Sequence, residues 1–281
     1  MPGSRGLARP RETGSPYGIV GHAVDAPEVT PLARVAIVTG AASGLGAALA
    51  SMLKSMGWSV AGLDLRPSDT DLSLTADVGD GEAVGRAVES VAERFGTLTA
   101  VASCAGSTPR EFHLAHLTTD AEWNAMLRVN LSGQFYLARA VLPHLVAARG
   151  SLCLVASVSA GYPLPGAVAY SAAKAGVVAL GRSLALEYGP RGVSVNVVSP
   201  GYIDTPMAAP TLSRPQLRES IEAGIPIGGI ASPEAIAEVI SFLLSGMVPS
   251  LAGQEIVVDG AKGLTSYGGV AMVNKLWERR E

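Results

Sequence analysis

Short apolar segments recur along most of the chain, separated by segments with a helical repeat. The apolar runs do not alternate with polar residues, so both faces of each expected strand should be buried, as in a parallel sheet covered by helices. Seven runs are expected strands: 35–38, 59–63, 72–76, 98–102, 152–156, 193–198 and 255–258, of which 72–76 is the weakest.

The segments between the strands carry apolar residues at three- and four-residue steps, which is typical of helices packed against a sheet. Thr119 and Glu122 form a capping-box signature, and Pro143 should bend or end the helix that they open. Ser232 followed by Pro233 predicts an N-cap with proline at the first helical position. Helices are expected over 45–56, 81–95, 119–145, 168–188 and 233–246.

Strand and helix alternate from about residue 32 to residue 260 without a break in composition. This order predicts a single doubly wound α/β domain, Rossmann-like, with a parallel sheet of about seven strands and helices on both faces. Residues 1–31 hold five prolines and no apolar repeat, so we expect an unpacked N-terminal extension. Residues 261–281 form a C-terminal tail with several large apolar side chains, which we expect to be an interface segment.

Composition excludes several classes of protein. With 48% apolar and 16% charged residues, the chain is expected to be compact rather than disordered. Its 21 basic and 24 acidic residues leave a formal charge of −3, so nucleic acid is not an expected partner. Two cysteines allow no disulfide framework, and no metal-ligand spacing joins them to the four histidines, so we expect a cytoplasmic protein without a metal site. We expect neither a membrane anchor nor an export signal.

A glycine-rich turn follows the first expected strand and leads directly into a helix. Glycines there allow a tight turn and a close approach of backbone N–H groups to a phosphate. Asp64 ends the second strand, where a carboxylate would accept hydrogen bonds from an adenosine ribose. The turn reads Thr39-Gly40-Ala41-Ala42-Ser43-Gly44-Leu45-Gly46, and its glycine spacing differs from the commonest dinucleotide-binding fingerprint.

Tyr170 and Lys174 lie one helical turn apart and therefore share a face. A free tyrosine has a pKa near ~10, and an adjacent ammonium favours the phenolate, so the two residues can act as an acid–base pair. Ser157 follows the fifth expected strand, at the edge where open α/β sheets bind ligands. Its hydroxyl is in a position to hold a carbonyl or hydroxyl oxygen of a substrate.

Together these residues resemble the short-chain dehydrogenase/reductase family in its single-domain form, over roughly residues 32–260. The resemblance rests on the Gly-x-x-x-Gly-x-Gly and Tyr-x-x-x-Lys motifs and on several shorter matches. One departure is Ser103-Cys104-Ala105-Gly106, where the family usually has Asn-Asn-Ala-Gly, and it leaves the local sheet bonding open. The shorter matches are Asp64, Asp77-Val78, Ala105-Gly106, Asn130, Ser157 and Pro200-Gly201-x-Ile203-x-Thr205.

The resemblance implies a catalytic role for four residues. Tyr170 would be the general acid in ketone reduction and the base in alcohol oxidation, and Ser157 would orient the substrate oxygen. Lys174 would bind the nicotinamide ribose and lower the pKa of the tyrosine. Asn130 would hold a water that links Lys174 to solvent.

The resemblance also implies a binding site for a nicotinamide dinucleotide. Asp77 and Val78 would flank the adenine, Ala105 and Gly106 would pass beside the ribose, and Ile203 and Thr205 would contact the carboxamide. The cofactor-binding residues would be Gly40, Ser43, Gly44, Leu45, Gly46, Asp64, Asp77, Val78, Ala105, Gly106, Tyr170, Lys174, Pro200, Gly201, Ile203 and Thr205.

The expected activity is an NAD(H)-dependent interconversion of a secondary alcohol and a ketone, with a small molecule as substrate. Asp64 and the lack of a basic residue at 41–43 favour NAD(H) over NADP(H). Two alternatives stay open: an NADPH-dependent 3-oxoacyl carrier-protein reductase, and a dinucleotide-binding protein without turnover. Residues 207–224 are expected to form a mobile flap over the substrate.

The two long helices over 123–145 and 168–188 are read as apolar on more than one face. A symmetry mate is the simplest cover for such a face, so we expect a homotetramer, or otherwise a homodimer. The residues in excess of one core stripe are Phe135, Leu137, Leu180 and Leu184.

Overall fold

The structure is a computed structural model that describes residues 34–265 and residue 270. The expected N-terminal extension therefore lies outside the described residues. Most of the expected C-terminal interface segment also lies outside them, and only residues 261–265 and residue 270 of it are described.

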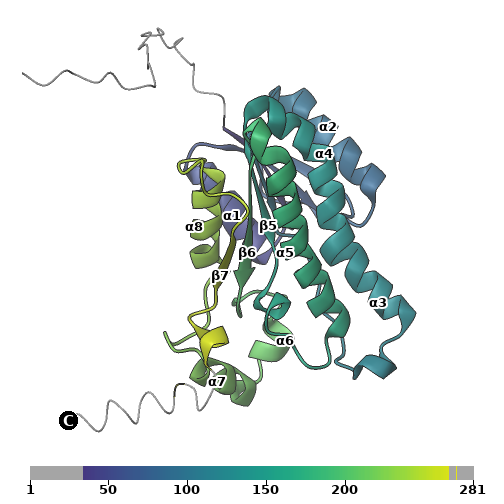
Figure 1. Cartoon of the computed structure of the whole chain (residues 1–281), viewed down its shortest axis with the longest axis vertical. Helices are drawn as coiled ribbons and strands as arrows, with labels where there is room; N and C mark the ends of the chain where they lie inside the picture. The colour runs from purple at the N-terminus through teal and green to yellow at the C-terminus, as the bar shows by residue number, and fades with distance from the viewer. Residues whose placement is uncertain (1–33, 266–269, 271–281) are drawn as a thin grey trace, which may run out of the picture. The chain divides into compact units, whose positions relative to one another are not determined.

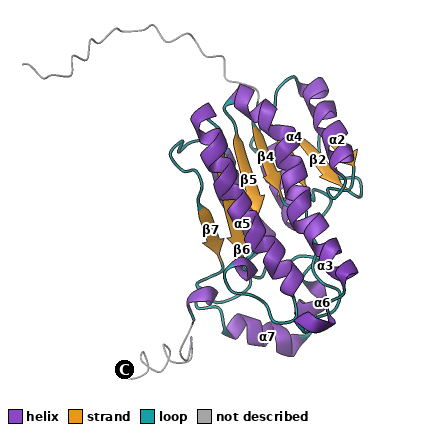
Figure 2. Ribbon diagram, turned by 45° about the vertical axis from the view of Figure 1, so that its right-hand side comes forward, coloured by secondary structure: helices purple, strands orange, loops and turns teal. Residues whose placement is uncertain are grey.

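Seven parallel strands form one sheet in the order β3-β2-β1-β4-β5-β6-β7 (Figure 2). All seven expected strands are present, with bounds that differ by one or two residues at most ends. The strands are β1 (Val35–Thr39), β2 (Ser59–Asp64), β3 (Leu72–Thr75), β4 (Ala100–Ser103), β5 (Ser151–Val155), β6 (Ser194–Pro200) and β7 (Glu255–Val258).

The strand order reverses between β1 and β4. After β1 the chain moves outward to β2 and β3, and then crosses back to place β4 on the other side of β1. In open α/β sheets, ligands bind outside the carboxyl ends of the strands at the point where the strand order reverses. The topology therefore predicts a ligand-binding site at the edge of the sheet where Thr39 and Ser103 lie in register.

Helices cover both faces of the sheet (Figure 1). α2, α4 and α5 pack on one face, and α1 and α8 pack on the other. No helix among residues 34–265 is long and apolar enough to cross a membrane. The longer helices are α1 (Gly44–Ser55), α2 (Gly81–Phe95), α3 (Asp120–Leu127), α4 (Gly133–Ala148), α5 (Val168–Tyr188) and α8 (Pro233–Leu244).

Successive residues of each central strand enter opposite cores. Ile37 packs with α2, α4 and α5, whereas its neighbour Val38 packs with α1 and α8. Because both directions are apolar, the strand appears in the sequence as an unbroken apolar run. The same core explains an error in the sequence interpretation: Leu137 and Leu184 are buried inside the protomer rather than left on an outer face.

The helix opened by Thr119 is interrupted by a π-turn. Thr119 and Glu122 form the expected capping box, and α3 then runs into a π-helical segment, η2 (Arg128–Ser132), before α4 begins. Pro143 does not end the helix, which continues to Ala148. Pro143 lies on the exposed side of α4, where solvent can satisfy a carbonyl group that loses its intrahelical partner.

Candidate active site

The glycine-rich turn between β1 and α1 is built as the sequence predicts. Gly40 and Gly44 have φ values of +70° and +55°, in the left-handed region that favours glycine. A Cβ on Gly46 would overlap the carbonyl group of Gly40, so this position needs glycine for close packing of helix on turn. Ser43 is the N-cap of α1 and has an extended backbone. The first turn of such a helix presents unpaired N–H groups, which suit a phosphate.

Asp64 holds the glycine-rich turn in place. Its Oδ2 accepts a hydrogen bond from the N–H of Ala42 at 3.1 Å, and its Oδ1 accepts one from the N–H of Arg66 at 3.1 Å. Each carboxylate oxygen keeps a further lone pair for another donor. Asp64 is therefore a positioning group for the turn as well as a candidate partner for ribose hydroxyls.

The loop after β4 packs directly on the glycine-rich turn. The N–H of Ala105 donates to Oγ1 of Thr39 at 3.0 Å, and a Cβ on Gly40 would lie 3.1 Å from the backbone of Ala105. Ser103 lies within β4, in register with Leu154 of β5. The departure from the usual family sequence therefore does not interrupt the sheet.

Gly106 lies against two of the predicted catalytic residues. A Cβ at this position would be 3.0 Å from Oδ1 of Asn130 and 3.7 Å from Nζ of Lys174. Cys104 is close enough to Lys174 for the ammonium to stabilise its thiolate, but burial dominates and raises the pKa of the Cys104 thiol to about 12. A thiol with this pKa stays protonated at neutral pH and is a poor nucleophile.

Asn130 is completely buried in the π-turn. Its Oδ1 accepts from the N–H of Ser107 at 3.1 Å, and its Nδ2 donates to the carbonyl of Met126 at 3.1 Å. Both ends of the amide are engaged, so its orientation is fixed by the hydrogen-bond network. π-turns within α-helices are frequent at functional sites.

Ser157, Tyr170 and Lys174 lie beside the carboxyl end of β5. Ser157 Oγ accepts from the N–H of Ser159 at 3.1 Å. Nζ of Lys174 lies 5.7 Å from the centre of the Tyr170 ring and donates to the carbonyl of Val155 at 2.9 Å. The predicted acid–base pair therefore lies next to Ser157, the serine that is expected to hold the substrate oxygen.

The pKa values of the tyrosine and the lysine respond mainly to burial. Burial raises the pKa of Tyr170, and a hydrogen bond with the Ser157 side chain lowers it only in part. Burial lowers the pKa of Lys174 to about 8. The expectation that Lys174 lowers the pKa of Tyr170 is therefore not met in this structure, because Lys174 is bound to the Val155 carbonyl and desolvation of the phenolate dominates.

The segment after β6 reaches the glycine-rich turn. Pro200 ends β6, and the N–H of Gly201 donates to the carbonyl of Val258 at 2.9 Å. Ile203 pairs with Ala231 in an isolated bridge. A Cβ on Gly44 would lie 3.3 Å from the side chain of Thr205, so the two predicted binding segments are in contact.

Asp77 and Val78 contact the two ends of the π-turn that carries Asn130. Asp77 Oδ2 accepts from Nη1 of Arg128 at 2.8 Å, and its Oδ1 accepts from the N–H of Gly79 at 2.8 Å. The Arg128 hydrogen bond, with help from that of Gly79, holds the pKa of Asp77 below its ordinary value although burial acts in the opposite direction.

Residues 207–224, the expected flap, contain two short helices, α6 (Ala209–Leu212) and α7 (Pro215–Ala223). Arg218 of α7 bonds Asp204 at 3.1 Å and Glu222 at 2.9 Å. The bond to Asp204 connects α7 to the loop that carries Ile203 and Thr205, and the bond to Glu222 lies within α7.

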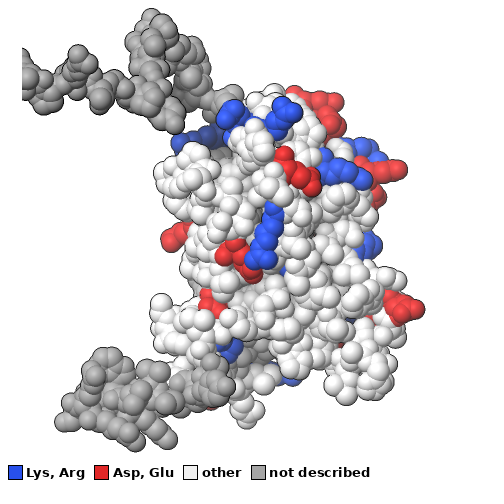
Figure 3. Space-filling view, viewed as in Figure 1, with Lys and Arg blue, Asp and Glu red and all other residues white. Residues whose placement is uncertain are grey.

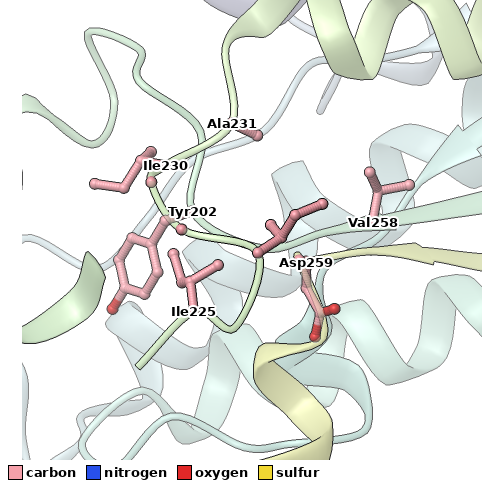
Figure 4. Close-up of a pocket in the computed structure, with 10 residues that line it drawn as sticks. Tyr202, Ile225, Ile230, Ala231, Val258 and Asp259 are labelled. Carbon is pink, nitrogen blue, oxygen red and sulfur yellow. The ribbon is translucent and has the colours of Figure 1, made fainter. Parts of the chain in front are cut away.

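A hollow of about 120 Å³ lies at the end of β7, with Tyr202, Ile225, Ile230, Val258 and Asp259 in its wall (Figure 4). The Asp259 carboxylate accepts the N–H groups of Ala261 at 2.9 Å and Gly263 at 2.7 Å. These bonds hold the start of the turn η5 (Lys262–Leu264), which backbone hydrogen bonds complete. No predicted catalytic residue is among the described residues that line this hollow.

A larger cavity, of about 280 Å³, lies next to Asn130. Ser107 and Met126, the two backbone partners of Asn130, are both in its wall, together with the half-buried His113. Nε2 of His113 lies 3.4 Å from the carboxylate of Glu122. Asn130, a predicted catalytic residue, is therefore close to a cavity whose lining is mostly apolar.

Sequence reasoning missed three residues that hold the site: Ser107, Arg128 and Gln134. Gln134 carried a signal, because it is a polar residue that falls on the buried stripe between Asn130 and Leu137. Nothing in the sequence marked Arg128 or Ser107, because their partners, Asp77 and Asn130, are 51 and 23 residues away in the chain.

Comparison with known proteins agrees with this geometry. Residues 40–265 match the family model described as enoyl-(acyl carrier protein) reductase. The chain is 35% identical to 2-(R)-hydroxypropyl-CoM dehydrogenase from Xanthobacter autotrophicus, over 82% of this chain and 98% of the relative. It is 32% identical to 3-oxoacyl-(acyl-carrier-protein) reductase from Thermotoga maritima, over 81% of this chain and 96% of the relative.

A solved structure is similar throughout the domain. A short-chain type dehydrogenase/reductase from Mycobacterium ulcerans superimposes with a TM-score of 0.78 at 26% identity, over 82% of this chain and 90% of that one. The matched family model covers most of the chain, including every predicted catalytic residue. The protein therefore belongs to the short-chain dehydrogenase/reductase family and is an oxidoreductase that acts on CH–OH groups.

Proposed function

We propose that this protein interconverts a secondary alcohol and a ketone with NAD(H) as cofactor, and that Tyr170 is its acid–base residue. The observation that carries the proposal is the grouping of Ser157, Tyr170, Lys174 and Asn130 at the carboxyl edge of the sheet, beside a glycine-rich turn. Similarity to a dehydrogenase of a hydroxypropyl compound supports a secondary alcohol as substrate.

The residues present fit a nicotinamide dinucleotide. The backbone around Gly40, Gly44 and Gly46 has no room for larger side chains, and the helix that starts there offers N–H groups to a pyrophosphate. Because Gly106 has no side chain, it does not cover the side chains of Asn130 and Lys174. When bound, the cofactor supplies or accepts the hydride, which no side chain of this chain can do.

The side chains would then orient the substrate oxygen and transfer its proton. The hydroxyl of Ser157 orients the oxygen, and Tyr170 gives it a proton in ketone reduction or removes one in alcohol oxidation. Lys174 is 5.7 Å from the tyrosine ring centre and is poised to bind ribose hydroxyls. The side-chain amide of Asn130 is fixed by its hydrogen bonds to the backbone of Ser107 and Met126. A fixed amide at this place suits an ordered water beside Lys174.

Asp64 supports NAD(H) over NADP(H). Its carboxylate lies at the end of β2 and would repel a 2′-phosphate on the adenosine ribose. Leu65 is largely exposed and offers no compensating charge, although the exposed Arg66 is next in the chain.

An NADPH-dependent 3-oxoacyl carrier-protein reductase is the second candidate. It is favoured by the 32% identity to such a reductase from Thermotoga maritima, which covers 96% of that protein. A binding protein without turnover is disfavoured by the intact set of four catalytic residues.

Binding and turnover measurements discriminate these possibilities. Titration with NADH and NADPH, followed by fluorescence, should give tighter binding of NADH. Reduction of NAD⁺ should then be screened with steroid, terpene, cyclic-diol and hydroxyacyl alcohols. Cofactor binding without turnover of any alcohol or ketone would favour a dinucleotide-binding protein without activity. A preference for NADPH with 3-oxoacyl substrates would favour the 3-oxoacyl carrier-protein reductase.

We further propose a cytoplasmic homotetramer. Phe135 of α4 and Leu186 of α5 are 42% and 80% exposed, which supports a partner over these helices. The face of the molecule in Figure 3 consists largely of residues other than Lys, Arg, Asp and Glu, although charged side chains gather at its upper end and recur near its centre and edges. The thiols of Cys104 and Cys153 are unpaired, in keeping with a reducing compartment.

A further inference from the structure

The guanidinium of Arg128 lies over the segment 77–79. Its Nη1 bonds Oδ2 of Asp77 at 2.8 Å, and a Cβ on Gly79 would lie only 2.8 Å from Cζ of Arg128. Gly79 therefore provides the space in which the guanidinium lies. Asp77 Oδ1 in turn accepts the N–H of Gly79 at 2.8 Å, so the segment and the arginine form one bonded unit.

The same segment also touches the other end of the π-turn. A Cβ on Gly133 would lie 3.1 Å from both Cγ2 and the carbonyl oxygen of Val78. The N–H of Gly133 donates to the carbonyl of Arg128 and closes the turn. Residues 77–79 thus rest on both ends of the π-turn, and Asn130 lies between those two ends.

We propose that Arg128 is a positioning residue for the adenosine half of the dinucleotide. The proposal rests on the proposed function and on the expectation, drawn from the family resemblance, that Asp77 and Val78 flank the adenine. Arg128 fixes the direction of the Asp77 carboxylate and the path of the backbone at Gly79. It thereby also joins the adenine-binding segment to the turn that carries Asn130.

Stability alone does not account for this pair. Arg128 is 50% exposed and Asp77 is 37% exposed, and exposed ion pairs contribute little to folding. What the geometry adds is a fixed orientation of the Asp77 carboxylate, because Arg128 holds one of its oxygens and the N–H of Gly79 holds the other. A hydrogen bond of ordinary net strength, about 1 kcal/mol, corresponds to about a fivefold change in a dissociation constant.

The first test is Arg128→Ala, with binding of NADH and of ADP-ribose measured by calorimetry. ADP-ribose lacks the nicotinamide, so an effect on the adenosine half must appear with both ligands. We expect both dissociation constants to rise by about fivefold, with little change in the melting temperature. Arg128→Lys should restore part of the affinity. Arg86→Ala, which removes an exposed arginine 3.8 Å from Glu82, is the matched control and should leave both constants unchanged.

The second test leaves Arg128 in the sequence but moves its guanidinium away from the segment 77–79. Gly79→Ala puts a methyl group where the guanidinium lies, so it should weaken ADP-ribose binding as Arg128→Ala does. Added to Arg128→Ala, it should have no further effect, because the group it displaces is gone. Unchanged ADP-ribose and NADH binding in both single variants, with a wild type that binds them, overturns the proposal for Arg128 alone. A wild type that binds neither NADH, NADPH nor ADP-ribose overturns the proposed function and this proposal together.

Discussion

The side chains of Gln134 and Lys174 donate to the same acceptor, the carbonyl oxygen of Val155, at 2.8 and 2.9 Å. A carbonyl oxygen has two lone pairs and can accept both bonds. Gln134 belongs to α4, Lys174 to α5 and Val155 to β5, so this oxygen joins two helices to the strand beneath them. If Lys174 turns toward another partner, Gln134 keeps the buried carbonyl satisfied.

This shared acceptor makes Lys174→Met a tolerable substitution with a defined pH signature. Burial lowers the pKa of Lys174 from 10.5 to about 8, so between these values the unfolded chain binds more protons than the folded one. The lysine's penalty to stability is therefore full below pH 8 and is relieved as pH rises toward 10.5, by at most about 3 kcal/mol. The free energy of unfolding of Lys174→Met minus that of the wild type should fall between pH 7 and pH 10 in urea titrations. A pH-independent difference would contradict the lowered pKa.

Replacing Tyr170 by Phe should abolish turnover and leave cofactor binding nearly intact. The substitution removes only the hydroxyl, and loss of a general acid–base group typically costs about 10²–10⁴-fold in rate. Steady-state kinetics and NADH fluorescence titration measure the two effects separately. Retention of more than about a tenth of the wild-type activity would remove Tyr170 from its proposed role.

The ratio of kcat/KM values for the two cofactors should favour NAD(H), and Asp64→Asn should reduce that preference. The substitution removes the negative charge that repels a 2′-phosphate, while the remaining amide oxygen can still accept from Ala42. Arg66→Ala is the companion variant. A wild type that prefers NADPH and loses this preference in Arg66→Ala would show that Arg66 controls the pocket.

Ala261→Gly should stabilise the protein. Ala261 is exposed and has a φ of +68°, a left-handed conformation that costs a residue with a Cβ about 1–2 kcal/mol. Glycine relieves this cost but gains freedom in the unfolded chain, which leaves a net gain of roughly 0.5–1 kcal/mol. Chemical denaturation measures the change. The matched control is Ala179→Gly on the exposed side of α5, which should instead lose about 1 kcal/mol.

Light scattering of the full chain should report a tetramer. A chain that ends at Gly263 tests whether the segment beyond it, which contains Tyr267, Met272, Val273, Leu276 and Trp277, supports that assembly. We expect the shortened chain to dissociate at least to dimers. A monomeric full chain contradicts the assembly, whereas an unchanged tetramer after truncation contradicts only the role of the tail.

Much of the fold could be predicted because local pattern and burial coincide. The run 35–38 reads as a buried strand because Ile37 and Val38 enter two apolar cores, and α5 has the predicted bounds because Val168 and Tyr188 limit one uninterrupted repeat. The number of apolar faces on α4 and α5 could not be read from periodicity alone. Leu137 and Leu184 were assigned to an outer face, but the sheet and neighbouring helices surround them.

The candidate site divides in a similar way. Glycines and the Tyr170–Lys174 pair are short-range patterns, so the sequence sufficed to predict them. The Arg128–Asp77 bond joins residues 51 positions apart, and the contact between Gln134 and Val155 spans 21. Such pairings depend on how the elements pack, and no local repeat encodes them.

The π-turn at Arg128–Ser132 also has a consequence for how this region can change in evolution. One additional residue in a helix rotates everything before it by about 100° relative to everything after it. Deleting a single residue there would restore an ordinary helix and turn α3, with its capping box, away from the loop at Ser107. A relative that is one residue shorter at this point should therefore present a different side chain to Gly106. An alignment gap here would identify enzymes that keep the asparagine in their sequence but place another residue at its position in the fold.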